Sequence, residues 1–139
     1  MKHSLQNFGM GIDIVDIERF KKLPFSKNKD FYKKIFSDSE IKYCLKFNEP
    51  YEHFAAKFAI KESVIKSLGK KLPLTSIITD HKNLRPIVEI KNSSEYFFKV
   101  TLSHEEEFAV AVVMFEIDIE DAEVVMYLYR LNAFLLDTG

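Results

Sequence analysis

Residues 52–69, EHFAAKFAIKESVIKSLG, contain the clearest structural signal in this sequence. Its apolar residues recur at spacings of three and four, which predicts an α-helix over residues 52–68. Gly69 marks the end of this helix, because glycine adopts the left-handed conformation of a C-terminal cap without steric cost. The helix is apolar on nearly every side, so we expect it to lie at the centre of the molecule.

Strands are predicted on both sides of this helix in the sequence. FGMGIDIVDI is rich in β-branched residues that alternate imperfectly with others, and YFFKVTL and FAVAVVMFEI flank the polar loop SHEEE. The strands are expected at residues 8–17, 72–78, 85–91, 96–102 and 108–117, with a turn at 80–84. The pattern predicts an α+β fold in which one central helix packs on a small antiparallel sheet.

Residues 30–47 have helical spacing. Ser37 and Glu40 stand at the spacing of a capping box, so a helix is expected to restart at Ser37. Cys44 lies on the amphipathic face of this region and is expected to be a packing residue. The last 20 residues are expected to form one more helix or a contact between subunits.

Composition sets the class of the protein. The chain has 139 residues, of which 47% are hydrophobic and 14% aromatic, and this excludes a disordered chain and suits one domain. A single cysteine excludes a disulfide framework and favours a reducing, cytoplasmic location. The N-terminus lacks an apolar core of signal-peptide length. The longest apolar stretch, residues 124–136, is shorter than the roughly 20 residues of a membrane span, so we expect a soluble protein without a membrane partner.

Charge is divided unevenly along the chain. Residues 1–104 carry 19 basic and 12 acidic side chains, whereas residues 105–139 carry one basic and nine acidic ones. The segment 18–34 is the most basic. It is either a solvated lysine-rich face or a docking surface for an anionic partner. Only three arginines and a pI of about 6.4 argue against nucleic acid as that partner.

Asp13 stands within a strand whose neighbours are mostly apolar. Period-2 alternation places it on the same face as Gly11 and Val15. Ile12 and Ile14 occupy the other face, so both faces are expected to be largely buried. A carboxylate in such a strand is costly unless it is paired, hydrogen-bonded or bound to a cation. It either caps a neighbouring helix or belongs to a site that the adjacent glycines leave open to close approach.

Glu62 lies on an apolar stripe of the central helix. It either forms a simple helix pair with Lys66, four residues later, or belongs to a site. Lys57, Lys61 and Lys66 crowd the same helix. A carboxylate among lysines in an apolar setting is typical of a site for a divalent cation and phosphate oxygens together. Mg²⁺ suits such a site, because it takes one or two carboxylates and completes its octahedron with water and substrate phosphates.

Histidines are the remaining candidates. His104 lies in the SHEEE loop between the two strongest strands, where functional residues concentrate. The alternative is a short turn capped by Ser103 and Glu106 that leaves His104 exposed. His53 and His81 lack the spacing of metal ligands and are expected to be ordinary surface residues.

Five segments together resemble the holo-acyl-carrier-protein synthases, a family of 4′-phosphopantetheinyl transferases. GMGIDIVDIERF is similar to the family's glycine-x-Asp-Ile strand, and FAAKFAIKESVIKSLG is similar to its Phe-Ala-x-Lys-Glu helix. IFSDSE, NLRP and VTLSHEEEFAVAVV resemble the family's helix start, turn and closing Ser-His hairpin. The match runs in order from about residue 9 to residue 116.

The resemblance implies the 4′-phosphopantetheinyl transferase fold and its reaction. The family transfers 4′-phosphopantetheine from coenzyme A to a serine of apo-acyl carrier protein, for fatty-acid biosynthesis, and releases adenosine 3′,5′-bisphosphate. It is usually a homotrimer with active sites between subunits. Residues 1–116 would form the transferase domain, and residues 117–139 a C-terminal extension without a role in the family.

The resemblance also implies roles for individual residues. Asp13 and Glu62 would hold Mg²⁺, for which Mn²⁺ is a substitute, and Glu62 or a metal-bound water would be the base. Lys66 would offset charge on the transferred phosphate. Arg19 and Lys22 would dock the acidic helix of the carrier protein. The residues expected to contact coenzyme A are Lys57, Lys61, Asn83, Pro86 and His104.

Three positions depart from the family pattern. Lys57 stands where arginine is common and loses bidentate phosphate geometry. Leu84 replaces the usual glycine of the turn, and Glu105 stands where threonine is frequent. These departures motivate an alternative, a non-catalytic paralogue that binds coenzyme A or a carrier protein. Retention of Asp13, Glu62 and Lys66 together favours the enzyme.

Overall fold

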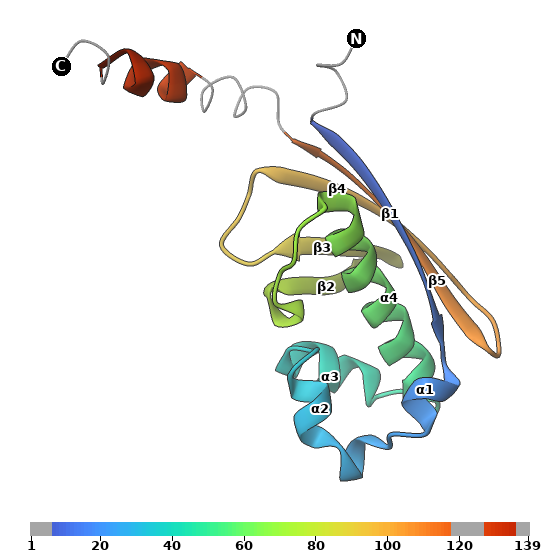
Figure 1. Ribbon diagram of the computed structural model, residues 1–139. Helices are drawn as coiled ribbons and strands as arrows, with labels where there is room; N and C mark the ends of the chain where they lie inside the picture. Colours follow the sequence, from blue (N-terminus) through green and yellow to red (C-terminus); the bar gives the residue numbers. More distant parts are fainter. Residues whose placement is uncertain (1–6, 118–126, 136–139) are drawn as a thin grey trace.

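The computed structural model describes residues 7–117 and 127–135 (Figure 1). Helix α4, Pro50–Leu68, runs through the middle of the molecule with other elements around it. Pro50 suits the first turn, where a backbone N–H would have no helical partner. Gly69 ends the helix in the left-handed region, with φ of 66°, as the sequence predicts.

Two antiparallel sheets pack beside α4. The larger sheet has the order β1-β5-β4, and the smaller sheet is the hairpin β2-β3, whose strand β3 lies next to β4. The predicted α+β class is therefore confirmed. The strands are β1 Phe8–Asp16, β2 Ile77–Lys82, β3 Arg85–Ile90, β4 Tyr96–His104 and β5 Phe108–Ile117.

The predicted strand at 72–78 begins later than expected. Residues Leu74–Ser76 form a 3₁₀ turn, and β2 starts at Ile77. Pro73 explains the delay, because proline has no N–H to donate to a strand ladder.

Short helices gather at the N-terminal end of α4 (Figure 1). They are α1 Glu18–Lys21, α2 Lys29–Lys33 and α3 Asp38–Cys44, with a 3₁₀ turn at Phe25–Lys27. The predicted helical region 30–47 is thus interrupted, and it restarts at Ser37 as expected. The Ser37 hydroxyl accepts from the Glu40 N–H at 3.3 Å, and the Glu40 carboxylate accepts from the Ser37 N–H at 2.8 Å.

Small residues allow α4 to lie directly against the sheet. A Cβ added to Gly11 of β1 would stand 2.0 Å from the carbonyl oxygen of Ser63, and one added to Gly9 would stand 2.4 Å from that of Ser67. The Ser63 hydroxyl donates to the carbonyl of Ala111 on β5 at 3.0 Å. The glycines are therefore required for the close approach that brings the next residue on this face of β1, Asp13, against α4.

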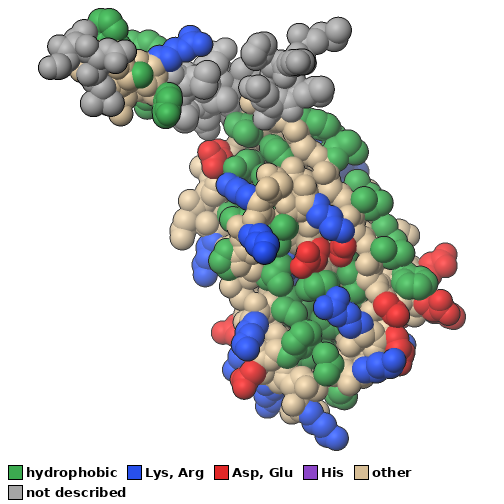
Figure 2. Space-filling model, viewed as in Figure 1, with side chains coloured by type: hydrophobic (Ala, Val, Ile, Leu, Met, Phe, Trp, Pro, Cys, Tyr) green, Lys and Arg blue, Asp and Glu red, His purple; other side chains and the backbone are tan. Residues whose placement is uncertain are grey.

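The opposite face of the sheet is uncovered. Ile12 and Ile14 are 60% and 62% exposed, so the expectation that both faces of β1 are buried is wrong for the single chain. The reason is that α4 covers only one face. Hydrophobic side chains follow the edge formed by β1 in Figure 2. The large exposed apolar residues of this face, which we call the open sheet face, are Phe8, Met10, Ile12, Ile14, Phe97, Phe108 and Met114.

A helix over residues 127–135 follows the sheet, as predicted for the end of the chain. Its side chains are exposed, including Tyr127, Tyr129 and Phe134. The remainder of the expected extension, residues 118–126 and 136–139, lies outside the described residues, so the division at residue 116 and the subunit contact stay predictions. Among the helices that the structure describes, none is long and apolar enough to cross a membrane.

Candidate active site

Asp13 is held by an ion pair between β1 and α4. Its side chain is 14% exposed, and its Oδ1 accepts from the Lys66 ammonium at 2.8 Å. The same ammonium donates to the carbonyl oxygen of Ile12 at 3.2 Å. The interpretation of Asp13 as a helix cap is therefore wrong, because its carboxylate faces α4 and binds a cation of the protein.

Glu62 lies one turn before Lys66 on the same side of α4. It is half-buried, and within the described ranges its carboxylate makes no ion pair or hydrogen bond. The alternative of a simple Glu62–Lys66 helix pair is therefore wrong, because Lys66 pairs with Asp13. The structure therefore brings Asp13 of β1 into contact with Lys66 of α4, and Glu62 stands one helical turn before that lysine. On the face of the molecule that Figure 2 shows, acidic side chains lie near the middle, with basic side chains around them.

These two carboxylates fit Mg²⁺ better than a metal enclosed by protein. In the part of the chain that the structure describes, no group of three or more His, Cys, Asp or Glu side chains is arranged to hold a metal ion. Structural zinc and all-protein calcium sites need more ligands than two. Mg²⁺ takes one or two carboxylates and leaves its other positions to water and substrate phosphates. Asp13 and Glu62 therefore suit a metal that the substrate helps to bind.

Lys61 is not available to a ligand. Its side chain is fully buried, and its three protons go to the Glu40 carboxylate at 2.7 Å and to the carbonyls of Ile35 and Leu74 at 2.8 and 2.9 Å. Lys57 is also buried. It donates to the Thr79 hydroxyl at 3.0 Å. The expectation that Lys57 and Lys61 contact coenzyme A is thus corrected: both ammonium groups point into the protein.

Glu40 joins three elements around these lysines. One carboxylate oxygen accepts from Lys61 and the Ser37 N–H, and the other accepts from the N–H and hydroxyl of Thr79 on β2. Burial alone raises the pKa of Glu40, but the ion pair with Lys61 and these hydrogen bonds outweigh it and hold the pKa below its usual value. The pair thereby fixes α3 and β2 to α4 immediately before Glu62 in the sequence.

His53 and His81 are half-buried parts of an aromatic cluster, so the expectation of ordinary surface residues is wrong. The His53 ring stacks on Phe47 with centroids 3.7 Å apart, and the His81 ring stacks on Tyr43 at 5.1 Å. Burial, and then the nearby His104, lower the pKa of His53. The i, i+4 spacing from His53 to Lys57 would have placed His53 on an inward side of α4.

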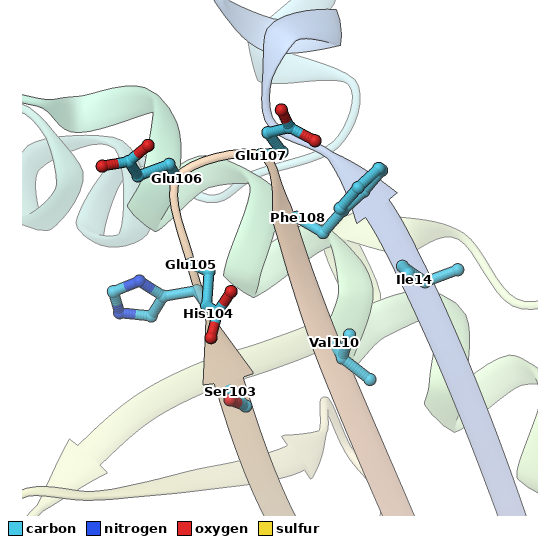
Figure 3. A pocket seen from close by; sticks show the side chains of 8 residues that line it. All are labelled: Ile14, Ser103, His104, Glu105, Glu106, Glu107, Phe108 and Val110. Carbon is cyan, nitrogen blue, oxygen red and sulfur yellow. The ribbon is translucent and has the colours of Figure 1, made fainter.

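His104 is exposed at the end of β4, 6.4 Å from the His53 ring. Figure 3 shows its ring directed away from Ile14 and Val110, which lie on the open sheet face. The turn between β4 and β5 lines a recess of about 860 Å³. Its lining residues are Ile14, Ser103, His104, Glu105, Glu106, Glu107, Phe108 and Val110.

The other predicted contacts lie apart from Asp13 within one chain. Asn83 belongs to the β2–β3 turn and Pro86 to β3, and the strand order places β5 and β4 between that hairpin and β1. Arg19 and Lys22 are exposed in α1 and directly after it, beyond the end of β1. The Arg19 guanidinium lies 5.1 Å from the centroid of the Phe58 ring, so it rests on α4 at the surface.

Known proteins resemble this chain over most of its length. A model of the 4′-phosphopantetheinyl transferase superfamily matches residues 9–113. The holo-[acyl-carrier-protein] synthase of Thermodesulfovibrio yellowstonii is 38% identical over 109 residues, which are 76% of this chain and 96% of that protein. The synthase of Syntrophus aciditrophicus is 39% identical over 121 residues, with 78% and 94% covered.

Solved structures share the fold. The holo-(acyl-carrier-protein) synthase from Bacillus anthracis, in complex with CoA (3′,5′-ADP), has a TM-score of 0.70 and 27% identity. The similarity covers 79% of this chain and 96% of that one. The matches of family and fold confirm the resemblance seen in the sequence. This chain belongs to the 4′-phosphopantetheinyl transferase superfamily, in its branch of holo-[acyl-carrier-protein] synthases.

Proposed function

We propose that this enzyme transfers 4′-phosphopantetheine from coenzyme A to a serine of apo-acyl carrier protein, with Mg²⁺ held by Asp13 and Glu62, and so serves fatty-acid biosynthesis. One observation carries the proposal: the Asp13 carboxylate of β1 pairs with Lys66 of α4, one turn after Glu62 on the same side of that helix, within the span that matches the superfamily. The synthases from Bacillus anthracis and Helicobacter pylori, both similar to this chain, are complexes with coenzyme A or its nucleotide part.

The residues of the site suit the chemistry of this transfer. The serine oxygen forms a bond to the β-phosphorus of coenzyme A, and the bond to the bridging oxygen breaks with its electron pair on adenosine 3′,5′-bisphosphate. The serine proton goes to Glu62, whose carboxylate has no partner within the described residues, or to a water on the bound metal ion. Lys66 offsets charge on the transferred phosphate. A bound Mg²⁺, or Mn²⁺ as a substitute, would neutralise the diphosphate and polarise the phosphorus.

A homotrimer with the active site between subunits completes the proposal. The open sheet face is apolar, and contiguous exposed apolar surface marks protein–protein contacts. Asn83, Pro86 and His104 are kept as the proposed contacts to coenzyme A. The hairpin that carries Asn83 and Pro86 is separated from β1 within one chain, so a neighbouring subunit would supply it.

Arg19 and Lys22 are proposed to dock the carrier protein. Both are exposed, and they belong to the basic segment 18–34 at the end of β1. Summed positive charge steers an acidic partner toward the surface that carries it. The buried Cys44, whose pKa burial raises to about 12, is unreactive, and a cytoplasmic location is proposed from the single cysteine.

Intact-mass spectrometry tests the function directly. An apo-acyl carrier protein is incubated with this protein, coenzyme A and Mg²⁺, and a parallel sample contains EDTA. The proposal predicts a gain of one phosphopantetheine mass that EDTA abolishes. Measurable binding of coenzyme A without any mass gain, across several carrier proteins, would favour the non-catalytic paralogue instead.

A further inference from the structure

A cation of the protein already lies against the Asp13 carboxylate. The Lys66 ammonium is 2.8 Å from Asp13 Oδ1 and 3.2 Å from the carbonyl oxygen of Ile12. It therefore bonds to two oxygens of the strand, one charged and one neutral. These are the hard oxygen donors that a divalent cation such as Mg²⁺ also prefers.

The two partners of this ion pair differ in their freedom to move. The Asp13 side chain is 14% exposed and belongs to the face of β1 that lies against α4, where Gly11 permits no added atom. The Lys66 side chain is 53% exposed and has four methylene groups. Opening the pair therefore moves the lysine into solvent and leaves the aspartate in place.

Glu62 makes the two cations competitors. It precedes Lys66 by one turn on the same side of α4, so a metal ion held by Asp13 and Glu62 together would compete with the Lys66 ammonium for the Asp13 carboxylate. Mg²⁺ requires ligands at about 2.0–2.1 Å in a nearly octahedral arrangement. A divalent ion and an ammonium repel each other strongly at such short range.

We infer that metal binding at this site is an exchange of cations, in which Lys66 holds Asp13 until the metal displaces it. The inference rests on the proposed function of Asp13 and Glu62 as metal ligands. It adds two consequences. Lys66 weakens the affinity of the free enzyme for metal, and the arrival of metal releases the same ammonium to reach the phosphates of the substrate.

Binding of Mn²⁺, measured by the electron paramagnetic resonance of the free ion, tests the first consequence. The full chain is compared with Lys66→Gln, with Asp13→Asn, and with Lys70→Gln, a control at an exposed lysine just beyond the C-terminal cap of α4. We expect the dissociation constant to fall at least fivefold in Lys66→Gln and to stay within twofold in Lys70→Gln. Equal affinities of Lys66→Gln and the parent chain would overturn the exchange, and so would equal tightening in Lys70→Gln.

Labelling of lysines in the unaltered protein tests the second consequence without any variant. Acetic anhydride is applied with and without Mg²⁺, and the acetylation rates of Lys66 and Lys70 are read by peptide mass spectrometry. We expect Mg²⁺ to raise the rate at Lys66 at least threefold and to leave Lys70 unchanged. A rate at Lys66 that is unchanged or slowed would mean that Asp13 binds both cations together, against the exchange. If Asp13→Asn binds Mn²⁺ as well as the parent chain does, the proposed metal site itself fails.

Discussion

Two lysines five residues apart on α4 form ion pairs of nearly equal length in opposite surroundings. Lys61 lies 2.7 Å from Glu40 with both side chains fully buried, whereas Lys66 lies 2.8 Å from Asp13 with side chains 53% and 14% exposed. The buried pair has every proton and lone pair engaged and joins α3, α4 and β2. The exposed pair joins one flexible side chain to a carboxylate beside Glu62. The first pair holds the scaffold together, and the second belongs to the proposed active site.

The largest effect is expected at the exposed pair, on activity. Asp13→Asn and Glu62→Gln each remove the charge of a proposed metal ligand, and we expect each to lower the transfer rate by about 10³-fold or more, because the metal contribution is lost and Glu62→Gln also removes a candidate base. The rate is measured by mass gain of the carrier protein at saturating Mg²⁺. Asp16→Asn, at the exposed end of the same strand, is the control and should retain activity. A near-normal rate in either variant would exclude the metal pair.

The largest effect on stability is expected at the buried pair. Lys61→Met leaves the Glu40 carboxylate buried without its counter-charge, and loss of one partner of such a pair costs about 3–5 kcal/mol. Lys66→Met, at the partly exposed pair, is the matched control and should cost about 1 kcal/mol or less. Urea unfolding followed by circular dichroism measures both. The double variant Glu40→Leu with Lys61→Met should recover much of the loss, and equal costs for the two lysines would contradict the comparison.

The sequence predicted α4, its glycine cap and the capping box at Ser37, because each depends on local spacing. It also brought Asp13, Glu62 and Lys66 forward as one set, and the structure brings Asp13 and Lys66 into contact. It did not separate Lys61 from Lys66. Helical spacing gives the side of a helix on which a residue lies, but whether that side is covered depends on α3 and β2, which pack there from elsewhere in the chain.

The open sheet face shows that burial is equally hard to predict from sequence for a strand. Alternation in FGMGIDIVDI shows that both faces of β1 are largely apolar, and burial of both was the natural prediction. Among the described residues, α4 alone is long enough to cover a face of the sheet, and its close contact with Gly9 and Gly11 means that it covers the face on which these glycines lie. Ile12 and Ile14 are left exposed, and no pattern within one chain distinguishes a face covered by a helix from one that suits a second subunit.

A smaller effect is expected where the basic segment meets the carrier protein. Arg19→Glu should raise the KM for the carrier protein about 10-fold, because reversed charge on a steering surface weakens encounter with an acidic partner. The KM for coenzyme A should change less than twofold. Steady-state kinetics with each substrate varied in turn measure both. Arg130→Glu, outside the span matched by the superfamily, is the control, and equal changes in the two KM values would exclude a docking role.

Acid should lower the free energy of unfolding, because two half-buried histidines are harder to protonate in the folded protein than in the unfolded chain. Burial, with His104 for His53 and Lys57 for His81, lowers the pKa of both residues below the usual 6.5. The unfolded chain therefore binds protons more readily than the folded protein near pH 6. The free energy of unfolding has its maximum contribution from these histidines above pH 6.5 and decreases as the pH falls below 6.5. Glu40, whose pKa is also lowered, adds a further loss below its usual 4.5.

Urea unfolding at pH 7.5, 6.5 and 5.5 measures this dependence. His53→Gln keeps a planar polar side chain and removes one titrating group, so its stability should change less between pH 6.5 and 5.5 than that of the parent chain. An identical slope in both proteins would show that His53 does not contribute.

The smallest effect is expected at the β2–β3 turn, which is exposed and contributes no residue to either ion pair. Asn83 and Leu84 have φ of 50° and 66°, and two left-handed residues between paired strands form a type I′ turn. Asparagine tolerates this conformation, but for leucine it costs about 1–2 kcal/mol, and the Leu84 side chain is 97% exposed, so no packing offsets the strain.

Leu84→Gly removes this strain, but glycine also gives the unfolded chain more conformational entropy, which opposes folding. We therefore expect a net increase of about 0.5 kcal/mol in the free energy of unfolding, measured with urea. Leu84→Ala separates the causes, because it removes the side chain and keeps the strained Cβ. Should Leu84→Gly and Leu84→Ala destabilise the protein alike, and more so at low protein concentration, Leu84 packs against another subunit and belongs with the open sheet face.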